Sequence, residues 1–464
     1  MFRRLSNLRH SSFGFNGGVA TVAIVLCALA IPGAVAMRFL SLNQALLIAL
    51  GFVYATVHRH LSSQVVLSLA FALTFFFLPV PSRFIFGVDL LPIISLSLII
   101  FTLNRDSAIQ DSPKSGKQQF SSFYFVCAIL FAGLATLTSI FNYRGPEFLS
   151  WVILPIASAV IAKLLQRSAT LKFQDFMEFW TVGVALLMLL DVFGLVTSKY
   201  RSTDLFNLGR FTGSLGDYEL SAEIHGLSII VAIYVLLVTE SKWLRAIALL
   251  EITGFVALLV ATQTRSSFLL TLLGAILIIS SSATSKRLKR SLGTLALVGA
   301  SAQVVLLAGG SFQEIWNRLA STELNQDISG VANRSGVWDY FQNLRSFTNL
   351  PPIGNGFSYP YSEIQSYPHS LYLWILWSGG VFCLVILLTL VTSSIAGAVS
   401  RRKTFKVDAS AALIILCYVL VDQAKVEVAR FASSSWIFWL VLALTFSTFD
   451  NRGKASLTGE EKKN

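Results

Sequence analysis

The chain contains a long series of apolar stretches, each roughly 17 to 25 residues long, and this feature limits its fold more than any other. A helix of that length crosses the ~30 Å hydrocarbon core of a lipid bilayer. The stretches are continuously apolar, whereas the strands of a membrane β-barrel alternate over about ten residues. We therefore expect an all-α polytopic membrane protein, forming one integral membrane domain over residues 1–464.

About fourteen membrane spans are expected, within a range of about 12 to 14. They cover approximately residues 17–36, 39–57, 63–80, 84–103, 120–141, 147–165, 176–197, 219–239, 243–261, 266–284, 291–310, 370–397, 408–423 and 431–449. The first stretch follows three arginines and resembles a signal peptide. Because it is about 20 residues long and many apolar stretches follow, we interpret it as a retained helix.

The composition excludes the other broad classes of protein. Apolar residues make up 54% of the chain and charged residues 13%, against roughly 25% charged residues in soluble domains. With 11 prolines, 30 glycines and 4 cysteines, the chain is neither disordered nor disulfide-rich. The net charge of +12 is explained by basic cytoplasmic loops, so no nucleic-acid partner is expected.

Basic residues predict the orientation of the spans. Most of the 36 lysines and arginines fall on one side when the spans alternate from a cytoplasmic N-terminus. The dense basic clusters at 286–290 and 401–406 lie inside and flank a loop of nearly sixty residues, 311–369, which is therefore placed outside. Both termini, including the tail 450–464, are expected in the cytoplasm. Helical stripes of apolar residues predict short helices within the 311–369 loop, and its glycines and prolines after residue 350 predict turns.

Cysteines and acidic residues inside the apolar stretches have mainly structural interpretations. Cys27, Cys127, Cys383 and Cys417 lack metal-ligand spacing and are interpreted as packing residues, so neither a metal site nor a cofactor is expected. Asp191 and Asp422 are costly in an apolar stretch and serve either helix packing or a proton relay. Asp422 is three residues from Lys425, whereas Asp191 has no obvious partner in the sequence. His225 is assigned a structural role.

Four basic residues on the outer side are the candidates for chemistry, because cations are disfavoured there. They are Arg210, Arg265, Arg334 and His369. An arginine pairs bidentately with phosphate oxygens, and a histidine titrates close to neutral pH. Each also has a plainer interpretation. Arg265 is explained by anchoring at the interface, Arg334 by a solvated loop or a pair with Asp339, and His369 by a helix start.

Short motifs between about 205 and 400 resemble those of the O-antigen ligase and Wzy-type polysaccharide polymerase superfamily. These are Arg-x-Thr-Gly-x-x-Gly-Asp at 210–217, Thr-Arg-Ser-Ser at 264–267 and Asn-Arg-Ser-Gly-x-Trp at 333–338. They continue with Pro-x-Gly-x-Gly at 352–356, His-Ser-x-Tyr-Leu from 369, and Gly379-Gly380. Their order and the long loop before the histidine carry the resemblance. Ser370 stands where members of the superfamily often have Asn, and Tyr218-Glu219 where they often have Pro-Asn.

The resemblance implies a glycosyltransferase of the bacterial inner membrane that uses an undecaprenyl-diphosphate-linked glycan at the periplasmic face. The 311–369 loop would then be periplasmic. Arg265 and Arg334 would neutralise the departing diphosphate, and His369 would deprotonate the acceptor hydroxyl in an inverting, metal-independent displacement. Arg210, Tyr372, Asp217 and Glu219 would contact substrate, although the acidic pair has an alternative role in neutralising Arg210.

Three functions fit these residues. A polymerase, which we favour, extends one lipid-linked repeat with another, whereas a ligase passes the glycan to lipid A core. Flippase and chain-length regulator proteins are candidate partners in the bilayer. A transporter or lipid flippase would instead use the arginines to bind an anionic cargo, but no internal repeat typical of transporters is found.

Overall fold

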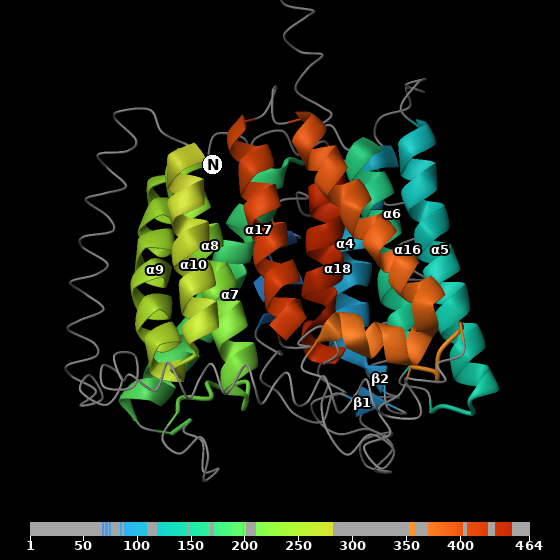
Figure 1. The fold of residues 1–464 in the computed structure, drawn as a ribbon. Helices are drawn as coiled ribbons and strands as arrows, with labels where there is room; N and C mark the ends of the chain where they lie inside the picture. Colours follow the sequence, from blue (N-terminus) through green and yellow to red (C-terminus); the bar gives the residue numbers. More distant parts are fainter. Residues whose placement is uncertain are drawn as a thin grey trace, which may run out of the picture.

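The computed structural model describes eleven ranges of the chain. They are residues 67–75 and 84–108 with short gaps, 118–145, 148–167, 171–197, 199–200, 210–281, 352–357, 370–401, 406–425 and 432–447. Their architecture is a bundle of long helices that run roughly parallel or antiparallel to one another (Figure 1).

The helices and the one strand pair of the described ranges have the following bounds. The helices are α4 (Leu90–Ala108), α5 (Gln118–Phe141), α6 (Leu149–Arg167), α7 (Phe173–Val196), α8 (Tyr218–Val238), α9 (Lys242–Thr262), α10 (Arg265–Ser281), α16 (Leu371–Arg401), α17 (Lys406–Lys425) and α18 (Ala432–Ser447). Strands β1 (Phe84–Ile85) and β2 (Val88–Asp89) form an antiparallel pair just before α4.

Apolar length supports the membrane assignment. Within the described ranges, 7 helices are long and apolar enough to cross a membrane, namely α5, α6, α7, α8, α9, α16 and α17. Shorter apolar helical segments occur at Ile93–Asn104, Ser266–Ser281 and Ser435–Ser447. Large apolar side chains such as Ile140, Leu189 and Phe382 are exposed on the outside of the bundle. A surface of this kind is suited to lipid and unsuited to water.

Two expected spans need correction. The stretch 84–103 does not begin as a helix, because its first residues form the β1–β2 hairpin and α4 starts only at Leu90. The stretch 370–397 is not one straight span. Gly380, with φ 73° and ψ −175°, breaks α16 into two parts, and the first part lies across the lower end of the bundle in Figure 1. The expected count of about fourteen spans is not confirmed, since several of them lie outside the described residues.

The helices form two groups that are joined through α17 and α18. On one side α8 contacts α7, α9 and α10, and on the other α6 contacts α4, α5 and α18. Helix α17 touches α8 and α10 as well as α16 and α18. Aromatic rings also join the groups, because Phe75 and Trp436 both contact Trp180 of α7, with ring centroids 5.0 and 6.2 Å away.

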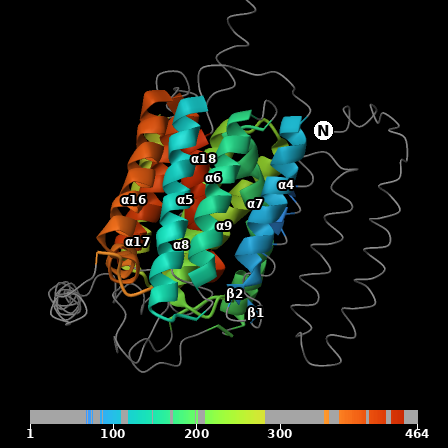
Figure 2. The same ribbon diagram turned by 90° about the vertical axis from the view of Figure 1, so that its right-hand side faces the viewer.

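The segments 210–217 and 352–357 both lie at one end of the bundle, drawn at the bottom in Figure 1 and called the lower end here. The expected outer ends of the described helices meet there, including the C-terminal ends of α5, α7 and α9 and the starts of α8 and α10 (Figure 1). Figure 2, turned by 90°, shows the same arrangement. Most of the motifs that suggested a site therefore gather at one end of the molecule.

Candidate functional site

Arg210 lies against the C-terminal end of α9. Its Nε donates to the carbonyl of Thr262 at 3.0 Å, and Nη2 donates to the carbonyl of Gln263 at 3.1 Å and the hydroxyl of Thr264 at 3.4 Å. The last carbonyls of a helix have no partner within the helix, and a cation there also compensates the helix dipole. The guanidinium carbon lies 3.8 Å from the ring centre of Tyr218. Arg210 thus joins residues 210–217 to the turn between α9 and α10.

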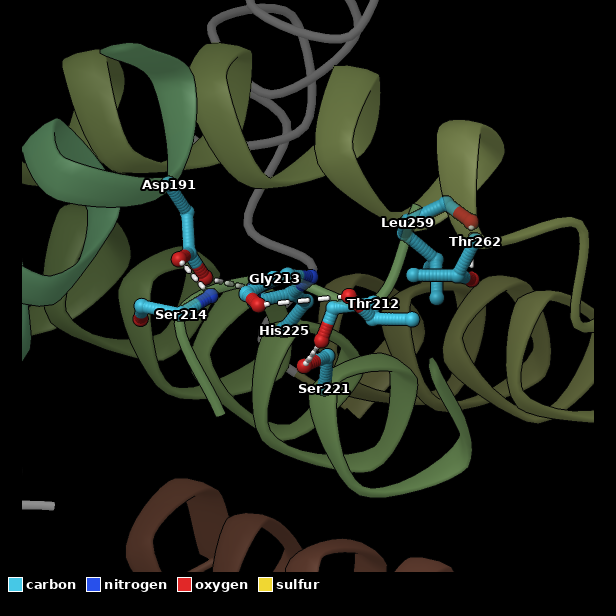
Figure 3. A network of polar contacts seen from close by, with 8 residues as sticks. All are labelled: Asp191, Thr212, Gly213, Ser214, Ser221, His225, Leu259 and Thr262. Atoms are coloured by element: carbon cyan, nitrogen blue, oxygen red, sulfur yellow. Dashed lines mark hydrogen bonds and ion pairs between the residues drawn. The ribbon is translucent and has the colours of Figure 1, made fainter. Parts of the chain in front are cut away.

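A tight turn at residues 213–216 follows Arg210 and rests on the side chain of Asp191 (Figure 3). The backbone N–H of Ser214 donates to Oδ1 of Asp191 at 2.7 Å, and the hydroxyl of Ser221 donates to the carbonyl of Thr212 at 2.6 Å. Gly213 has φ +64°, and a Cβ there would lie 2.6 Å from the hydroxyl oxygen of Ser221. Only glycine fits both this backbone conformation and this close approach.

Asp191 and His225 form a buried pair between α7 and α8. Nε2 of His225 lies 2.8 Å from Oδ2 of Asp191, and both side chains are 0% exposed. A carboxylate accepts hydrogen bonds, so Nε2 carries the hydrogen in this contact. Within the described residues Nδ1 of His225 has no hydrogen-bond partner. The structural role expected for His225 is consistent with this pair, and Asp191 has the partner that the sequence did not reveal.

Asp217 and Glu219 lie at the start of α8. Oδ1 of Asp217 accepts from the backbone N–H groups of Glu219 and Leu220 at 2.8 and 2.9 Å, so Asp217 is the N-cap of the helix. Glu219, in the first turn, is partly exposed. A carboxylate there also favours the helix through its dipole. The structure therefore gives Asp217 a local stabilising task in addition to the substrate contact predicted for it.

Arg265 is the first residue of α10 and directly follows Thr264, which Arg210 contacts. Its backbone is described and its side chain is not. The 210–217 and 264–267 motifs, about fifty residues apart in sequence, are therefore adjacent at the lower end. Arg334 and His369 lie outside the described residues, so the convergence predicted for all four basic residues stays a prediction.

Buried polar side chains join α8, α10 and α17 near the same end. Gln423 donates to Oε1 of Glu223 at 2.9 Å, and the hydroxyl of Ser267 lies 3.4 Å from Oδ1 of Asp422. Gly226 allows the close approach, since a Cβ there would lie 2.2 Å from the hydroxyl oxygen of Tyr418. The sequence identified Asp422 as a costly residue in an apolar stretch, but it did not reveal that three helices bring it together with Glu223 and a glutamine.

Tyr372 connects the first part of α16 to α17. Its hydroxyl donates to the carbonyl of Leu420 at 3.0 Å. The other end of this short helical part is held by residues 352–357, because the N–H groups of Asn355 and Gly356 donate to the carbonyls of Trp377 and Ser378 at 2.9 and 2.7 Å. This confirms the turns predicted from Pro-x-Gly-x-Gly over 352–357.

Arg144, three residues after the end of α5, also holds the 352–357 segment. The sequence did not identify this role. The Nε of Arg144 donates to the carbonyl of Asn355 at 2.8 Å, and its guanidinium carbon lies 5.7 Å from the ring centre of Trp377. The sequence placed Arg144 on the outer side, but no local motif linked it to residues more than two hundred positions away.

The first part of α16 contains two buried tryptophans, Trp374 and Trp377. Their rings lie 5.5 Å apart in a stacked arrangement. Cys127 and Cys383 are buried, as expected for packing residues, whereas Cys417 is exposed on α17.

Comparison with known proteins adds no relative. No protein-family model matches this chain, and no curated protein matches it in sequence.

Proposed function

We propose that this protein is a glycosyltransferase of the bacterial inner membrane that polymerises oligosaccharide repeats into an O-antigen or exopolysaccharide. The donor is an undecaprenyl-diphosphate-linked glycan, and the acceptor is a hydroxyl of a second lipid-linked repeat at the periplasmic face. The apolar helices support the membrane location, and the order of the motifs at 210–217, 264–267 and 333–338 supports the reaction.

The observation that carries the proposal is the contact between Arg210 and the turn that precedes Arg265. The guanidinium of Arg210 bonds to residues 262–264, and α10 begins at the next residue. A membrane-bound diphosphate needs several cations close together where the apolar helices end, and arginine is the side chain best suited to phosphate oxygens. Two arginine motifs at one end of the bundle meet the first part of this requirement.

In the proposed reaction the acceptor oxygen attacks the anomeric carbon of the donor. His369 takes the hydroxyl proton, and the bond between sugar and phosphate breaks with its electron pair remaining on the diphosphate. Arg265 and Arg334 stabilise the charge that develops on the departing group. The displacement inverts the anomeric configuration and forms no covalent intermediate with the protein.

The first part of α16 supports a position for His369 near the lower end. The helix starts at Leu371, two residues after His369. Consecutive Cα atoms are about 3.8 Å apart, so chain connectivity allows two residues before this start a reach of no more than about 8 Å. Tyr372 and residues 352–357 fix this part of α16 against its neighbours. Tyr372 bonds to Leu420, so we assign it to orienting the helix that follows the histidine.

The test is polymer formation by the purified full chain in lipid nanodiscs, supplied only with a lipid-linked repeat. We expect products of increasing length, and we expect His369→Ala to abolish them while its level in the membrane and its thermal unfolding stay unchanged. His60→Ala is a matched control, because the basic residues of the sequence place this histidine on the opposite, cytoplasmic side.

The alternatives have distinct outcomes in the same assay. A ligase forms no polymer from the repeat alone and transfers it only when lipid A core is added. A transporter forms no product in either case but moves the lipid-linked repeat between leaflets. Either of these results would overturn the proposal, as would normal polymer from His369→Ala.

A further inference from the structure

Glu251 lies near the middle of α9 in a fully buried position. It is nine residues after Lys242 and eleven before Thr262, and its exposed fraction is 0%. Neither side-chain oxygen has a hydrogen-bond partner within the residues that the structure describes. An ionised carboxylate without a partner in such a place costs at least several kcal/mol. The neutral acid is therefore the form that fits this environment.

The neighbouring helices are α7 and α8, and both present polar atoms to the same interface. The ring centre of His225 on α8 lies 5.2 Å from that of Phe255, which is one helical turn along α9 from Glu251. On α7, Met188 fills the space over Gly254. Thr181 lies seven and ten positions before Met188 and Asp191, so it shares their helix face.

Unpartnered polar atoms occur on all three helices. In the described part of the chain, Oγ1 of Thr181 and Nδ1 of His225 have no hydrogen-bond partner, and both residues are 0% exposed. Nearly all buried polar groups in proteins are bonded, so such a group calls for a specific explanation. Three packed helices each carry one such group, and the group on α9 is a carboxyl group, which can bind a proton.

Fixed charges do not account for Glu251. The ionisable side chains of α7, α8 and α9 include Asp175, Glu178, Asp191, Glu219, Glu223, His225, Tyr234, Lys242 and Arg245. None of them hydrogen-bonds to Glu251. Asp191 and His225 bond to each other, and Arg245 bonds to the carbonyl of Thr239.

We propose that Glu251 is a proton-binding site inside the membrane, occupied by a proton at neutral pH and enclosed by α7, α8 and α9. Loss of the proton leaves a bare carboxylate between these helices, so they must then admit a counter-charge or change their packing. Proton occupancy is therefore linked to the packing of the helix group that contacts the 210–217 segment. This site is independent of the glycosyl transfer proposed above.

Two carbodiimides of opposite polarity test the proposal on the purified full chain. Dicyclohexylcarbodiimide enters apolar regions and reacts with a protonated carboxyl. The O–H adds across a C=N bond to give an O-acylisourea, which rearranges to a stable N-acylurea without loss of any group. A water-soluble carbodiimide with glycine ethyl ester instead converts exposed carboxyl groups to amides. Peptide mass spectrometry locates each adduct.

We expect dicyclohexylcarbodiimide to modify Glu251 and the water-soluble reagent to leave it unmodified. Glu240 is exposed in the turn between α8 and α9 and serves as the matched control. The water-soluble reagent should modify Glu240, and dicyclohexylcarbodiimide should not. Glu251→Gln should remove the Glu251 adduct while polymer formation continues. Amide formation at Glu251 by the water-soluble reagent would overturn the proposal.

Infrared spectroscopy keeps the test decisive if the hydrophobic reagent cannot reach the residue. The wild-type spectrum minus that of Glu251→Gln should contain the C=O stretch of a protonated carboxylic acid at neutral pH. Carboxylate bands in its place would show an ionised Glu251 and contradict the proposal.

Discussion

The segments 210–217 and 352–357 both dock at the lower end of the bundle, but different groups hold them. Side chains hold the first segment, since Asp191 accepts from the backbone of Ser214 and Arg210 bonds to the end of α9. Close backbone approach distinguishes the second, since Asn355 and Gly356 donate to carbonyls of α16, and the side chain of Arg144 adds a bond to the carbonyl of Asn355.

This difference predicts which changes each segment tolerates. A segment held by a buried hydrogen-bonded pair is sensitive to loss of that pair, because the remaining partner stays buried without its hydrogen bond. A segment held by close backbone approach is sensitive to any added Cβ, because packed backbone cannot move aside. Substitutions at residues that hold each segment therefore test this difference.

Asp191→Ala should have the largest effect. It leaves His225 and the N–H of Ser214 buried without their partner, and we expect a loss of about 2–5 kcal/mol in the free energy of unfolding. Asp191→Asn keeps an acceptor for Ser214 and should cost less than half as much. Titration of the purified protein with SDS measures both. An Ala variant as stable as the wild type would show that side chains do not hold the first segment.

Gly380→Ala should be the next most damaging change. Gly380 has φ +73°, and a Cβ there would lie 2.2 Å from the carbonyl oxygen of Pro352, so we expect a loss of about 2–4 kcal/mol. Gly397→Ala on the same helix is the control, because its Cβ would lie 3.5 Å from the nearest atom. Thermal unfolding measures the stability of the two variants. Equal unfolding midpoints would show that close backbone contact at Gly380 does not stabilise the second segment.

Arg210→Gln should have a moderate effect on stability. It removes charge-assisted hydrogen bonds to the end of α9 and the contact with Tyr218, which together suggest a loss of about 1–3 kcal/mol. Arg210→Lys keeps the charge but not the planar fork, so it should restore only part of the loss. Full rescue by lysine in SDS titration would mean that charge alone matters at this position.

Asp217→Ala should have the smallest effect, about 1 kcal/mol, because it removes an N-cap from α8. Asp217→Ser also caps helices and should be close to the wild type in thermal unfolding. If both variants lose polymer formation while remaining stable, Asp217 contacts substrate in addition to its capping role.

Within the described ranges the sequence predicted the long apolar helices, because each apolar stretch is a local property of the chain. The hairpin before α4 escaped it because its two short strands lie inside a continuous apolar stretch. The break at Gly380 escaped it because it depends on close contact with Pro352 and Gly354.

The sequence identified the motif 210–217 as important, but it did not reveal that Asp191 and His225 hold this segment. Asp191 and His225 nevertheless lie at similar distances in sequence from the loop that joins their spans. Two polar residues at the same depth in neighbouring antiparallel helices are candidates for a pair, and this signal was present in the sequence.

Contacts across long separations account for most of what the sequence could not predict. Arg144 and Asn355, or Glu223 and Gln423, are about two hundred residues apart, and nothing in their local sequence links them. Arg210 was identified from its motif as a substrate contact, whereas its bonds to residues 262–264 became evident only from the packing of α8 against α9.

Binding of undecaprenyl diphosphate to three forms of the protein in nanodiscs tests the central claim most directly. The account assigns the diphosphate to the end of the molecule where Arg210 meets the start of α10, and assigns Arg144 to holding the 352–357 segment. Arg265→Gln should therefore weaken binding by at least about tenfold, the equivalent of about 1.4 kcal/mol, whereas Arg144→Gln should retain the wild-type affinity. Undiminished binding by Arg265→Gln, or an equal loss in both variants, would contradict the account.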